Sequence, residues 1–158
     1  MGMAPLPPLP YGGAGCKDDN YPEQTQVSLS QCGAPCGEDW IWYRGKCYYF
    51  SETYSDWDTS QSYCAFHNAS LALIDSQEEM DFLRRFKGMK DHWIGLHRDV
   101  NGESWVLADG SSFNNTFQIT GESPCVSLNN VRINSVDCYG DRRWICNKRD
   151  TEIHRTPL

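Results

Sequence analysis

The chain has 158 residues, which is long enough for one hydrophobic core, and a second full domain is not expected. Its formal net charge is −7, and 39% of its residues are apolar. The acidic balance argues against nucleic-acid binding and against attraction to anionic membranes, because both depend on clustered lysine and arginine. No segment approaches the roughly 18 consecutive apolar residues of a transmembrane helix.

Residues 1–35 are rich in proline, glycine and polar residues, so they are predicted to form a stalk or linker. The run PLPPLP within them fits either an SH3-domain ligand or an extended spacer, and the composition favours the spacer. The opening MGMAPLPPLPYGGAG has neither the basic region nor the apolar stretch of a signal peptide. We therefore expect that a membrane anchor or leader is missing, either because the ectodomain was trimmed or because this is an isoform without the anchor.

Aromatic residues become dense from Cys36 onward. The segment DWIWYRGKCYYFS, residues 39–51, has two short aromatic runs around Arg44-Gly45-Lys46, which predicts a β-hairpin. The segment SDWDTSQSYCAFH, residues 55–67, predicts a first helix. Its residues at helical spacing are Trp57, Ser60, Cys64 and His67.

The segment SQEEMDFLRRFKG, residues 76–88, is the clearest helix in the sequence. Ser76 and Glu79 are predicted to form a capping box, and Gly88 is expected to end the helix. An apolar stripe is predicted to pack into the core, and it comprises Met80, Leu83 and Phe86, with Phe82 one position off.

After Gly88 the chain is predicted to form short strands separated by turns. These are HWIGLH (92–97), SWVLADG (104–110), CVSLNN (125–130), SVDCYG (135–140) and RRWICNK (142–148). Asn101-Gly102 is read as a hairpin turn rather than as part of a calcium loop, because the spacing of glycine and glutamate does not fit an EF-hand. The order of hairpin, two helices and strands predicts an α+β domain.

The eight cysteines are many for this length and even in number. Zinc would need tight cysteine or histidine pairs, and only Cys32 and Cys36 come near that spacing, so disulfides in an oxidising compartment are the better interpretation. Two glycosylation sequons agree with an extracellular location: Asn68-Ala69-Ser70 and Asn114-Asn115-Thr116. The sequence alone leaves 105 pairings of eight cysteines open.

Several motifs resemble the C-type-lectin-like domain. Trp93-Ile94-Gly95-Leu96 is similar to the central WIGL motif of this family, and Trp144-Ile145-Cys146 to its closing strand. The chain most resembles the subgroup of the early lymphocyte activation antigen and related lectin-like ligands of natural killer cell receptors. The residues that carry this likeness are CYYF (47–50), MDFLRRFKG (80–88), DHWIGL (91–96) and WICNK (144–148).

The resemblance covers residues 36–149 and leaves 150–158 as a tail. It implies the long form of the fold, with an N-terminal hairpin, two helices, antiparallel sheets and three intrachain disulfides. The implied pairs are Cys36 with Cys47, Cys64 with Cys146, and Cys125 with Cys138. Cys16 and Cys32 remain, either as a pair within the chain or as bonds between two chains. We expect at least one interchain bond, and hence a homodimer, because a flexible stalk gains little from an isolated closed loop.

Sugar-binding members of the family hold calcium through a Glu-Pro-Asn or Gln-Pro-Asp turn and a Trp-Asn-Asp motif. The second motif corresponds here to Ile133, Asn134 and Ser135, so only the asparagine matches and a hydroxyl replaces the carboxylate. The first is represented by Glu122-Ser123-Pro124-Cys125, with no oxygen ligand after the proline. Since calcium takes six to eight oxygen ligands, we expect no calcium-dependent sugar binding and no cofactor.

Enzymatic activity is not expected, because the histidines are scattered and no nucleophile with its base is evident. The resemblance instead implies the glycosylated ectodomain of a type II membrane protein, on the cell surface or secreted. Its partner would be a lectin-like receptor on natural killer or other lymphoid cells. The implied partner-binding residues are Tyr139, Asp141, Arg142 and Arg143, with Arg132 and Phe117 as further candidates.

Three alternatives stay open at this point. Arg142 and Arg143 fit a solvated strand end nearly as well as a contact surface. A second function is calcium-independent binding of sulfated carbohydrate, against which the acidic balance counts. The third is an oligomeric structural or secreted form without receptor signalling.

Overall fold

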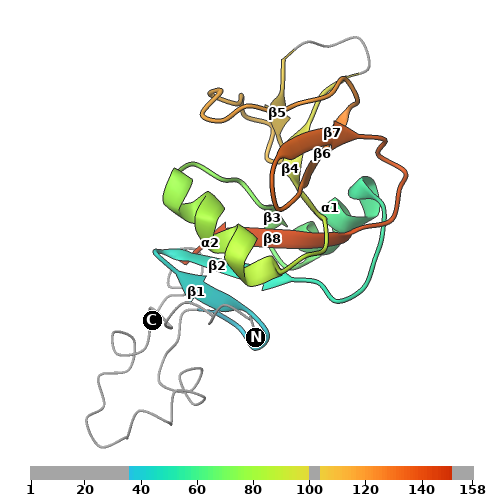
Figure 1. The fold of residues 1–158 in the computed structure, drawn as a ribbon. Coiled ribbons are helices and arrows are strands. Elements are labelled where there is room, and N and C mark those ends of the chain that lie inside the picture. The colour runs from blue at the N-terminus through green and yellow to red at the C-terminus, as the bar shows by residue number, and fades with distance from the viewer. Residues whose placement is uncertain (1–35, 100–103, 151–158) are drawn as a thin grey trace, which may run out of the picture. The chain divides into compact units, whose positions relative to one another are not determined.

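The computed structural model describes residues 36–99 and 104–150 (Figure 1). Two compact units are distinguished, Met1–Tyr49 with Lys148–Leu158, and Phe50–Asn147, and each is described by itself. The predicted stalk, Cys16, Cys32, the Asn101-Gly102 turn and most of the predicted tail lie outside the described residues. Within the described ranges, no helix has the length and apolar character needed to cross a membrane.

The first unit contains the predicted hairpin. Strand β1 (Ile41–Tyr43) pairs antiparallel with β2 (Lys46–Phe50), and Tyr43 lies opposite Lys46. The two turn residues have positive φ angles, 48° at Arg44 and 88° at Gly45, as a type I′ turn requires. A disulfide joins Cys36, which precedes β1, to Cys47 in β2.

The first helix of the second unit, α1, spans Trp57–Phe66. The Asp56 carboxylate caps it by accepting a hydrogen bond from the Thr59 N–H at 2.8 Å. Trp57, Ser60 and Cys64 are buried, as their spacing predicted, whereas His67 lies at the C-cap.

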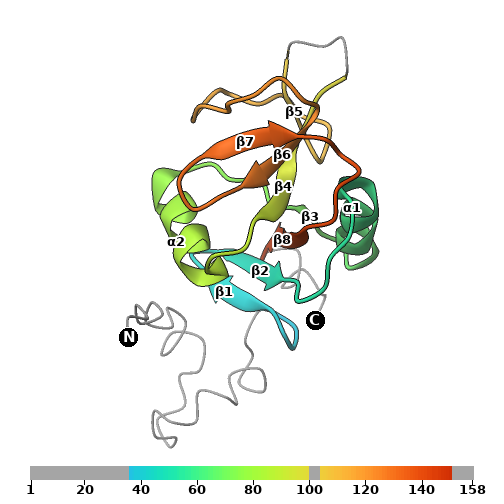
Figure 2. The same cartoon turned by 45° about the vertical axis from the view of Figure 1, so that its right-hand side comes forward.

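The second helix, α2, spans Gln77–Lys87, and the Ser76 hydroxyl caps it by accepting from the Glu79 N–H at 3.0 Å. The Glu79 carboxylate accepts a hydrogen bond from the Asp75 N–H. The predicted capping box would use the N–H of Ser76, one residue later. Gly88 ends the helix with φ 78°, as expected. The two helices lie on opposite sides of strand β4 (Figure 2).

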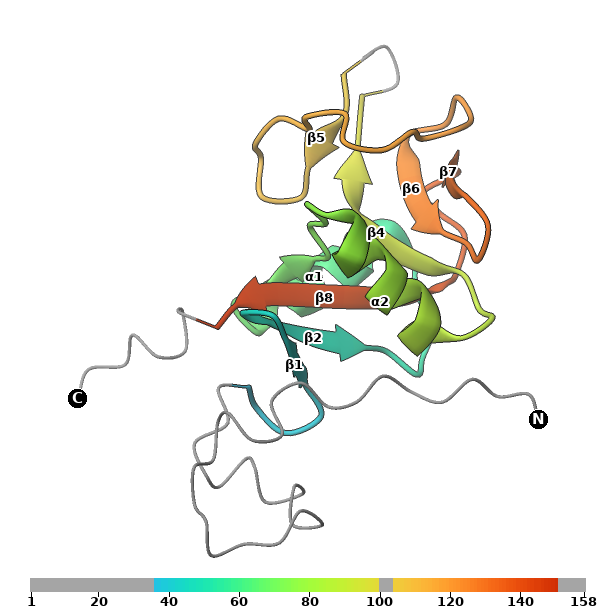
Figure 3. The same cartoon turned by 60° about the vertical axis from the view of Figure 1, so that its left-hand side comes forward.

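Strand β4 (His92–His97) is the centre of the second unit. It pairs antiparallel with β5 (Val106–Leu107) and β6 (Cys125–Leu128), and β6 pairs antiparallel with β7 (Ile133–Val136) (Figure 3). Strand β8 (Arg143–Arg149) pairs antiparallel with the short β3 (Ser70–Leu71) and parallel with β4. This parallel pair is present beside the antiparallel pairings that were expected.

Three predicted strands are shorter than their sequence patterns, and the segment 125–130 keeps only Cys125–Leu128 as β6. The segment 104–110 contributes only the two residues of β5. The segment 135–140 leaves the sheet after Val136, because the Asp137 carboxylate accepts a hydrogen bond from the Tyr139 N–H at 3.0 Å and forms a turn.

Gly95 permits the close approach of β3 to the central strand. Its N–H donates to the Ala72 carbonyl at 2.9 Å, and a Cβ at this position would lie only 2.3 Å from the Leu71 oxygen. Leu71 and the preceding motif residues Trp93 and Ile94 are fully buried. The glycine of the WIGL motif is therefore required because a side chain at this position would clash with the backbone of β3.

Two disulfides hold the second unit. One joins Cys64 in α1 to Cys146 in β8, and the other joins Cys125 at the start of β6 to Cys138. Together with the hairpin disulfide they are the three pairs that the resemblance implied, and the α+β class is confirmed.

Candidate partner-binding face

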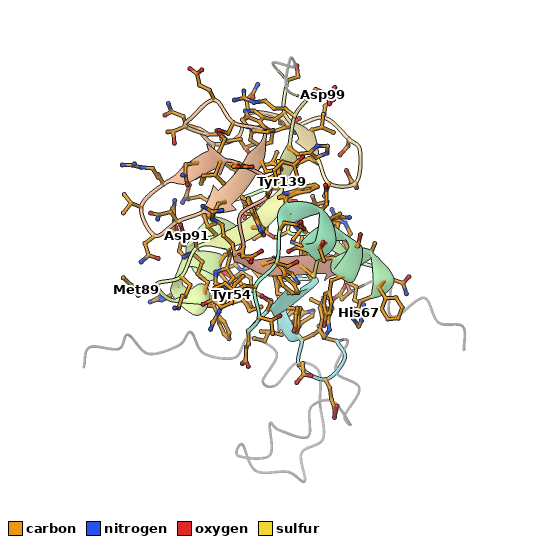
Figure 4. All side chains as sticks on the ribbon, turned by 90° about the vertical axis from the view of Figure 1, so that its right-hand side faces the viewer. Tyr54, His67, Met89, Asp91, Asp99 and Tyr139 are labelled. Atoms are coloured by element: carbon orange, nitrogen blue, oxygen red, sulfur yellow. A yellow bond between two sulfur atoms is a disulfide. The ribbon has the colours of Figure 1, made fainter. Side chains whose placement is uncertain are left out.

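An exposed surface of the second unit gathers aromatic, cationic and apolar side chains. We call it the Tyr54 face and define it by Tyr54, Met89, Lys90, Asp91, Tyr139, Asp141, Arg142 and Arg143. Figure 4 shows four of these residues, Tyr54, Met89, Asp91 and Tyr139, in one area of the molecule. Met89 is 80% exposed and Tyr139 is 79% exposed, whereas Tyr54 is half exposed. Large apolar side chains that stay in water are candidates for contact with a partner.

A shallow hollow lies within this face. It has a volume of 380 Å³ and is lined by Tyr54, Lys90, Asp91, Gly140, Asp141 and Arg142. The lining comes from three segments that are distant in sequence. Residues 90–91 and 140–142 meet because β4 and β8 run parallel, with His92 opposite Arg143, and Tyr54 joins them through the Ser55–Arg142 bridge.

Three cations contact aromatic rings here. The Lys90 ammonium lies 6.0 Å and the Arg143 guanidinium 5.4 Å from the centre of the Tyr54 ring. Hydrogen bonding with Lys90, and to a smaller degree with Arg143, lowers the pKa of the Tyr54 phenol. Arg142 lies 4.9 Å from the centre of the Trp93 ring. These contacts hold flexible cationic side chains against rigid rings, which reduces the entropy that binding would cost.

The Arg143 guanidinium retains an unused donor. Its Nε is buried and has no hydrogen-bond partner among the described residues. A buried donor without a partner is costly to the fold.

Lys87 fixes the loop that carries Met89 and Lys90. Its ammonium is buried and donates to the Lys90 carbonyl at 2.7 Å, the Gly88 carbonyl at 3.1 Å and the Asn130 side-chain oxygen at 3.1 Å. Burial lowers the pKa of Lys87 to about 8, and the nearby Asp91 carboxylate opposes this shift. The end of α2 is thereby tied to the turn between β6 and β7.

The same turn contacts the Tyr54 face directly. The Asn129 amide donates to the Asp91 carboxylate at 3.0 Å, and the Asn130 amide lies 3.0 Å from the Met89 sulfur. The turn therefore restrains two members of the face from the side.

His92 lies beneath the face and is only 1% exposed. Its Nδ1 lies 2.9 Å from the Lys90 carbonyl oxygen, so Nδ1 carries the proton in the neutral ring. Burial is the main cause that lowers the pKa of His92 to about 4, and the charges of Lys87 and Arg143 act in the same direction. The imidazole is neutral near pH 7 and belongs to the support of the face.

Segments 54–57 and 138–142 are joined by backbone hydrogen bonds. Ser55 and Arg142 exchange two bonds, of 3.0 and 2.9 Å, and the Trp57 N–H donates to the Cys138 carbonyl at 3.1 Å. The Trp93 indole also donates to the Ser55 carbonyl at 2.8 Å. The backbone of the face is therefore held by the central strand as well as by its own loops.

The candidates named from the sequence fall in three places. Tyr139, Asp141, Arg142 and Arg143 lie in the Tyr54 face, and Arg132 is exposed in the turn between β6 and β7. Phe117 lies elsewhere, in a hollow of 440 Å³ that it shares with Trp105, Phe113, Asn115, Gln118 and Ile119. Their role in binding stays a prediction.

Sequence reasoning missed Tyr54, Met89, Lys90 and Asp91. Met89 and Lys90 follow the helix stop at Gly88, where exposed loop residues are expected. Nothing in the local pattern places them beside Arg142, because that depends on the parallel pairing of β4 and β8.

The residues at the calcium positions of the fold do not fit a calcium ion. The Ser135 hydroxyl accepts from the Ser123 N–H at 3.0 Å and donates to the Thr120 carbonyl at 3.1 Å, so its proton and one of its lone pairs are in use. The Arg98 guanidinium lies close by and donates to the carbonyls of Gly121 and Ser123, each at 3.2 Å. A second positive charge would be repelled there, and the carboxylates that calcium needs are missing from this motif.

The described ranges, 36–99 and 104–150, hold no group of three or more His, Cys, Asp or Glu residues placed to bind a metal ion. Both sequon asparagines, Asn68 and Asn114, are exposed, and their occupancy stays a prediction.

The fold, the disulfides and the WIGL core define a C-type lectin-like domain. The family model described as Lectin C-type domain matches residues 53–148. The chain belongs to this family, and the resemblance seen in the sequence is confirmed.

The relatives include CD69 and members of the C-type lectin domain family 2. The chain is 42% identical over 131 residues to human "Early activation antigen CD69", covering 82% of the chain and 65% of that protein. It is 42% identical over 135 residues to mouse "C-type lectin domain family 2 member D", covering 84% of the chain and 65% of that protein. Human "C-type lectin domain family 2 member B" is 44% identical over 115 residues, with 72% of the chain and 76% of that protein covered. The chain thus spans somewhat less than two thirds of the length of CD69.

Solved structures support the same fold. The "Mouse Scavenger Receptor C-type Lectin carbohydrate-recognition domain" superimposes with a TM-score of 0.65 at 24% identity, covering 72% of the chain and 98% of that structure. The "Trimeric structure of Kupffer cell C-type lectin receptor Clec4f" gives a TM-score of 0.66 at 28% identity, covering 80% of the chain and 93% of that structure.

Proposed function

We propose that the protein is the ectodomain of a type II immune protein at the cell surface, and that a lectin-like receptor on natural killer or other lymphoid cells binds it. The proposal rests on the similarity to CD69 and to the C-type lectin domain family 2 proteins. The observation that carries it is the Tyr54 face. Recognition is non-enzymatic and is made through protein–protein contacts.

The composition of the Tyr54 face suits a protein partner. Tyrosine, methionine and arginine are enriched in interfaces, and tyrosine and arginine dominate the residues that carry most of the binding energy. Tyr54 and Arg142 are held by neighbouring side chains, so binding loses little conformational freedom. The exposed Met89 and Tyr139 supply apolar area at the edge of the hollow.

Binding proceeds without calcium in this proposal. The Ser135 hydroxyl and the Arg98 guanidinium hold the loop around Gly121 and Ser123 through direct hydrogen bonds. The loop therefore has a support that does not depend on a metal ion.

The functional unit is a homodimer in this proposal. Cys16 and Cys32 are the candidates for the interchain bond, since the other six cysteines pair within the chain. A non-reducing gel that runs at the mass of a monomer would contradict it.

The experiment is a binding screen with a soluble, glycosylated dimer on natural killer cells and on cells that each display one lectin-like receptor. Tyr54→Ala and Arg142→Ala are expected to weaken the binding at least tenfold, which corresponds to about 1.4 kcal/mol at a central contact. The matched control is Arg85→Ala, which removes an exposed cation from α2. An equal loss in the control, or none in the two test variants, would reject the Tyr54 face.

Calcium-independent binding of sulfated carbohydrate is the second candidate, because Lys90, Arg142 and Arg143 bring three cations to one face. Asp91 and Asp141 line the same hollow and oppose a polyanion. A sulfated-glycan array probed with and without chelator separates the two functions. Salt-sensitive glycan binding that Arg142→Ala abolishes, together with no receptor binding, would favour the carbohydrate.

A further inference from the structure

Phe66 is an aromatic side chain at the surface with no evident use in the fold. It is the last residue of α1 and is 82% exposed, although its ring lies 5.2 Å from that of His67. It is separate from the Tyr54 face, which accounts for the exposed Tyr54, Met89 and Tyr139. An exposed ring of this size is a candidate for contact with another apolar surface.

The sequon Asn68-Ala69-Ser70 begins two residues later, and the end of the helix fixes its first residue. The Asn68 N–H donates to the Ala65 carbonyl and the Ala69 N–H to the Cys64 carbonyl, both at 2.9 Å. Asn68 has φ 60° and is exposed. These bonds fold the chain back over the last turn of α1, so Asn68 is held close to the turn that carries Phe66.

We propose that Asn68 carries an N-linked glycan and that its first N-acetylglucosamine packs against the ring of Phe66. This sugar has an apolar face of C–H groups and an acetamide methyl, which suit the electron-rich face of a phenyl ring. The packing removes from water the ring that the fold leaves exposed. The inference rests on the proposed function only in that the chain must enter the secretory pathway.

The modification is a group transfer. The side-chain nitrogen of Asn68 bonds to C1 of the sugar, a lipid-linked diphosphate leaves from C1, and the amide loses one proton to a base of the transferase. Ser70 lies in β3, where it pairs with Asn147, and its hydroxyl donates to the Leu71 carbonyl at 3.0 Å. The transfer therefore precedes folding, when the sequon is still extended and accessible.

The second sequon provides an internal contrast. Asn114 is also exposed, but the neighbouring rings of Phe113 and Phe117 lie 4.9 Å apart and are partly buried. They pack against each other, so a sugar at Asn114 meets no ring as exposed as Phe66. A glycan there is expected to contribute little to stability.

The test uses the full chain expressed in mammalian cells behind a cleavable leader, which delivers it to the secretory pathway whatever its natural location. Asn114→Gln leaves Asn68 as the only sequon, and endoglycosidase trims the glycan to one N-acetylglucosamine. The trimmed protein is compared with the same sequence produced without a glycan in bacteria and refolded, each with and without Phe66→Leu, so that Ser70 and its hydrogen bond are kept in both. Leucine keeps apolar bulk at position 66 but has no ring.

We expect an intact mass with one sugar, and an acetyl-methyl proton resonance shifted upfield by the ring current of Phe66. The sugar is expected to raise the folding equilibrium constant roughly 2- to 10-fold, and this gain is expected to vanish with Phe66→Leu. The reciprocal protein, with Asn114 as the only sequon, is expected to show neither effect.

Three outcomes would overturn the proposal: an unmodified Asn68, an acetyl-methyl signal that Phe66→Leu does not move, or an equal stability gain in both backgrounds. If the Phe66 ring serves self-association instead, Phe66→Leu will weaken the dimerisation of the sugar-free protein. None of these results bears on receptor binding through the Tyr54 face, so the two proposals fail independently.

Discussion

The Ser135 hydroxyl is bonded to the Ser123 N–H at 3.0 Å, across the position where sugar-binding relatives place a carboxylate on calcium. The same hydroxyl donates to Thr120, and a Cβ on Gly121 would lie only 2.5 Å from it. The Ser135 side chain, which replaces the calcium ligand, therefore links β7 directly to the loop of residues 120–123 that precedes β6.

Ser135→Ala is expected to lower the free energy of unfolding by roughly 1–3 kcal/mol, because the Ser123 N–H and the Thr120 carbonyl lose a partner in a partly buried site. Chemical denaturation measures this loss. Ser62→Ala, which removes an exposed hydroxyl from α1, serves as the control and should change little. A loss no larger than that of the control would show that the link is weak.

Calcium is expected to leave the stability unchanged. The side chains of Ile133, Asn134 and Ser135 offer no carboxylate, and Arg98 places a positive charge beside the loop. The melting temperature is therefore expected to be the same in millimolar calcium and in chelator. A rise in calcium would contradict this, since a ligand that binds only the folded state must stabilise it.

The protein is expected to lose stability as the pH falls from about 6.5 to about 4, through the titration of His92. Burial lowers the pKa of the folded state to about 4 from 6.5, so the unfolded state takes up the proton first. This contribution is fully present above pH 6.5, and at most about 3 kcal/mol is lost on acidification.

Denaturation curves at a series of pH values check this loss. His92→Asn keeps a donor for the Lys90 carbonyl but does not titrate, so the pH dependence of its stability should be flatter in this window. An unchanged slope would assign the acid sensitivity to other groups.

Lys87→Met is expected to lower the free energy of unfolding by roughly 2–3 kcal/mol, because three oxygen acceptors lose a charged donor while the apolar stem is kept. Hydrogen exchange is expected to become faster in residues 88–91 and 129–132, which the ammonium joins. Arg85→Met removes an exposed cation from the same helix and should leave exchange unchanged. Equal exchange in both variants would mean that Lys87 does not hold the loop.

The local elements could be predicted from the sequence because their signals are local. The aromatic hairpin, the capped helix 77–87 and the strand 92–97 follow from turn residues, caps and apolar spacing. Strand β3 was missed because two residues give no pattern, and the extent of β7 because the Asp137 side chain decides where it ends.

The candidate site was only half predictable. Tyr139, Asp141, Arg142 and Arg143 were named through the family resemblance, and the structure adds Tyr54, Met89, Lys90 and Asp91 to them. Residues 89–91 meet 141–143 through the parallel pairing of β4 with β8, His92 opposite Arg143, and Tyr54 meets them through the Ser55–Arg142 bridge. Such long-range pairing leaves no trace in the composition of either segment.

The Tyr54 face is a conformational epitope, because its residues come from three separate segments of the chain. Residue 54, residues 89–91 and residues 139–143 are neighbours only when the sheet is formed, so no linear peptide from this chain can imitate the face. Reduction of the Cys64–Cys146 and Cys125–Cys138 bonds would disperse it along with the fold. A partner that bound this face would therefore recognise only the folded protein.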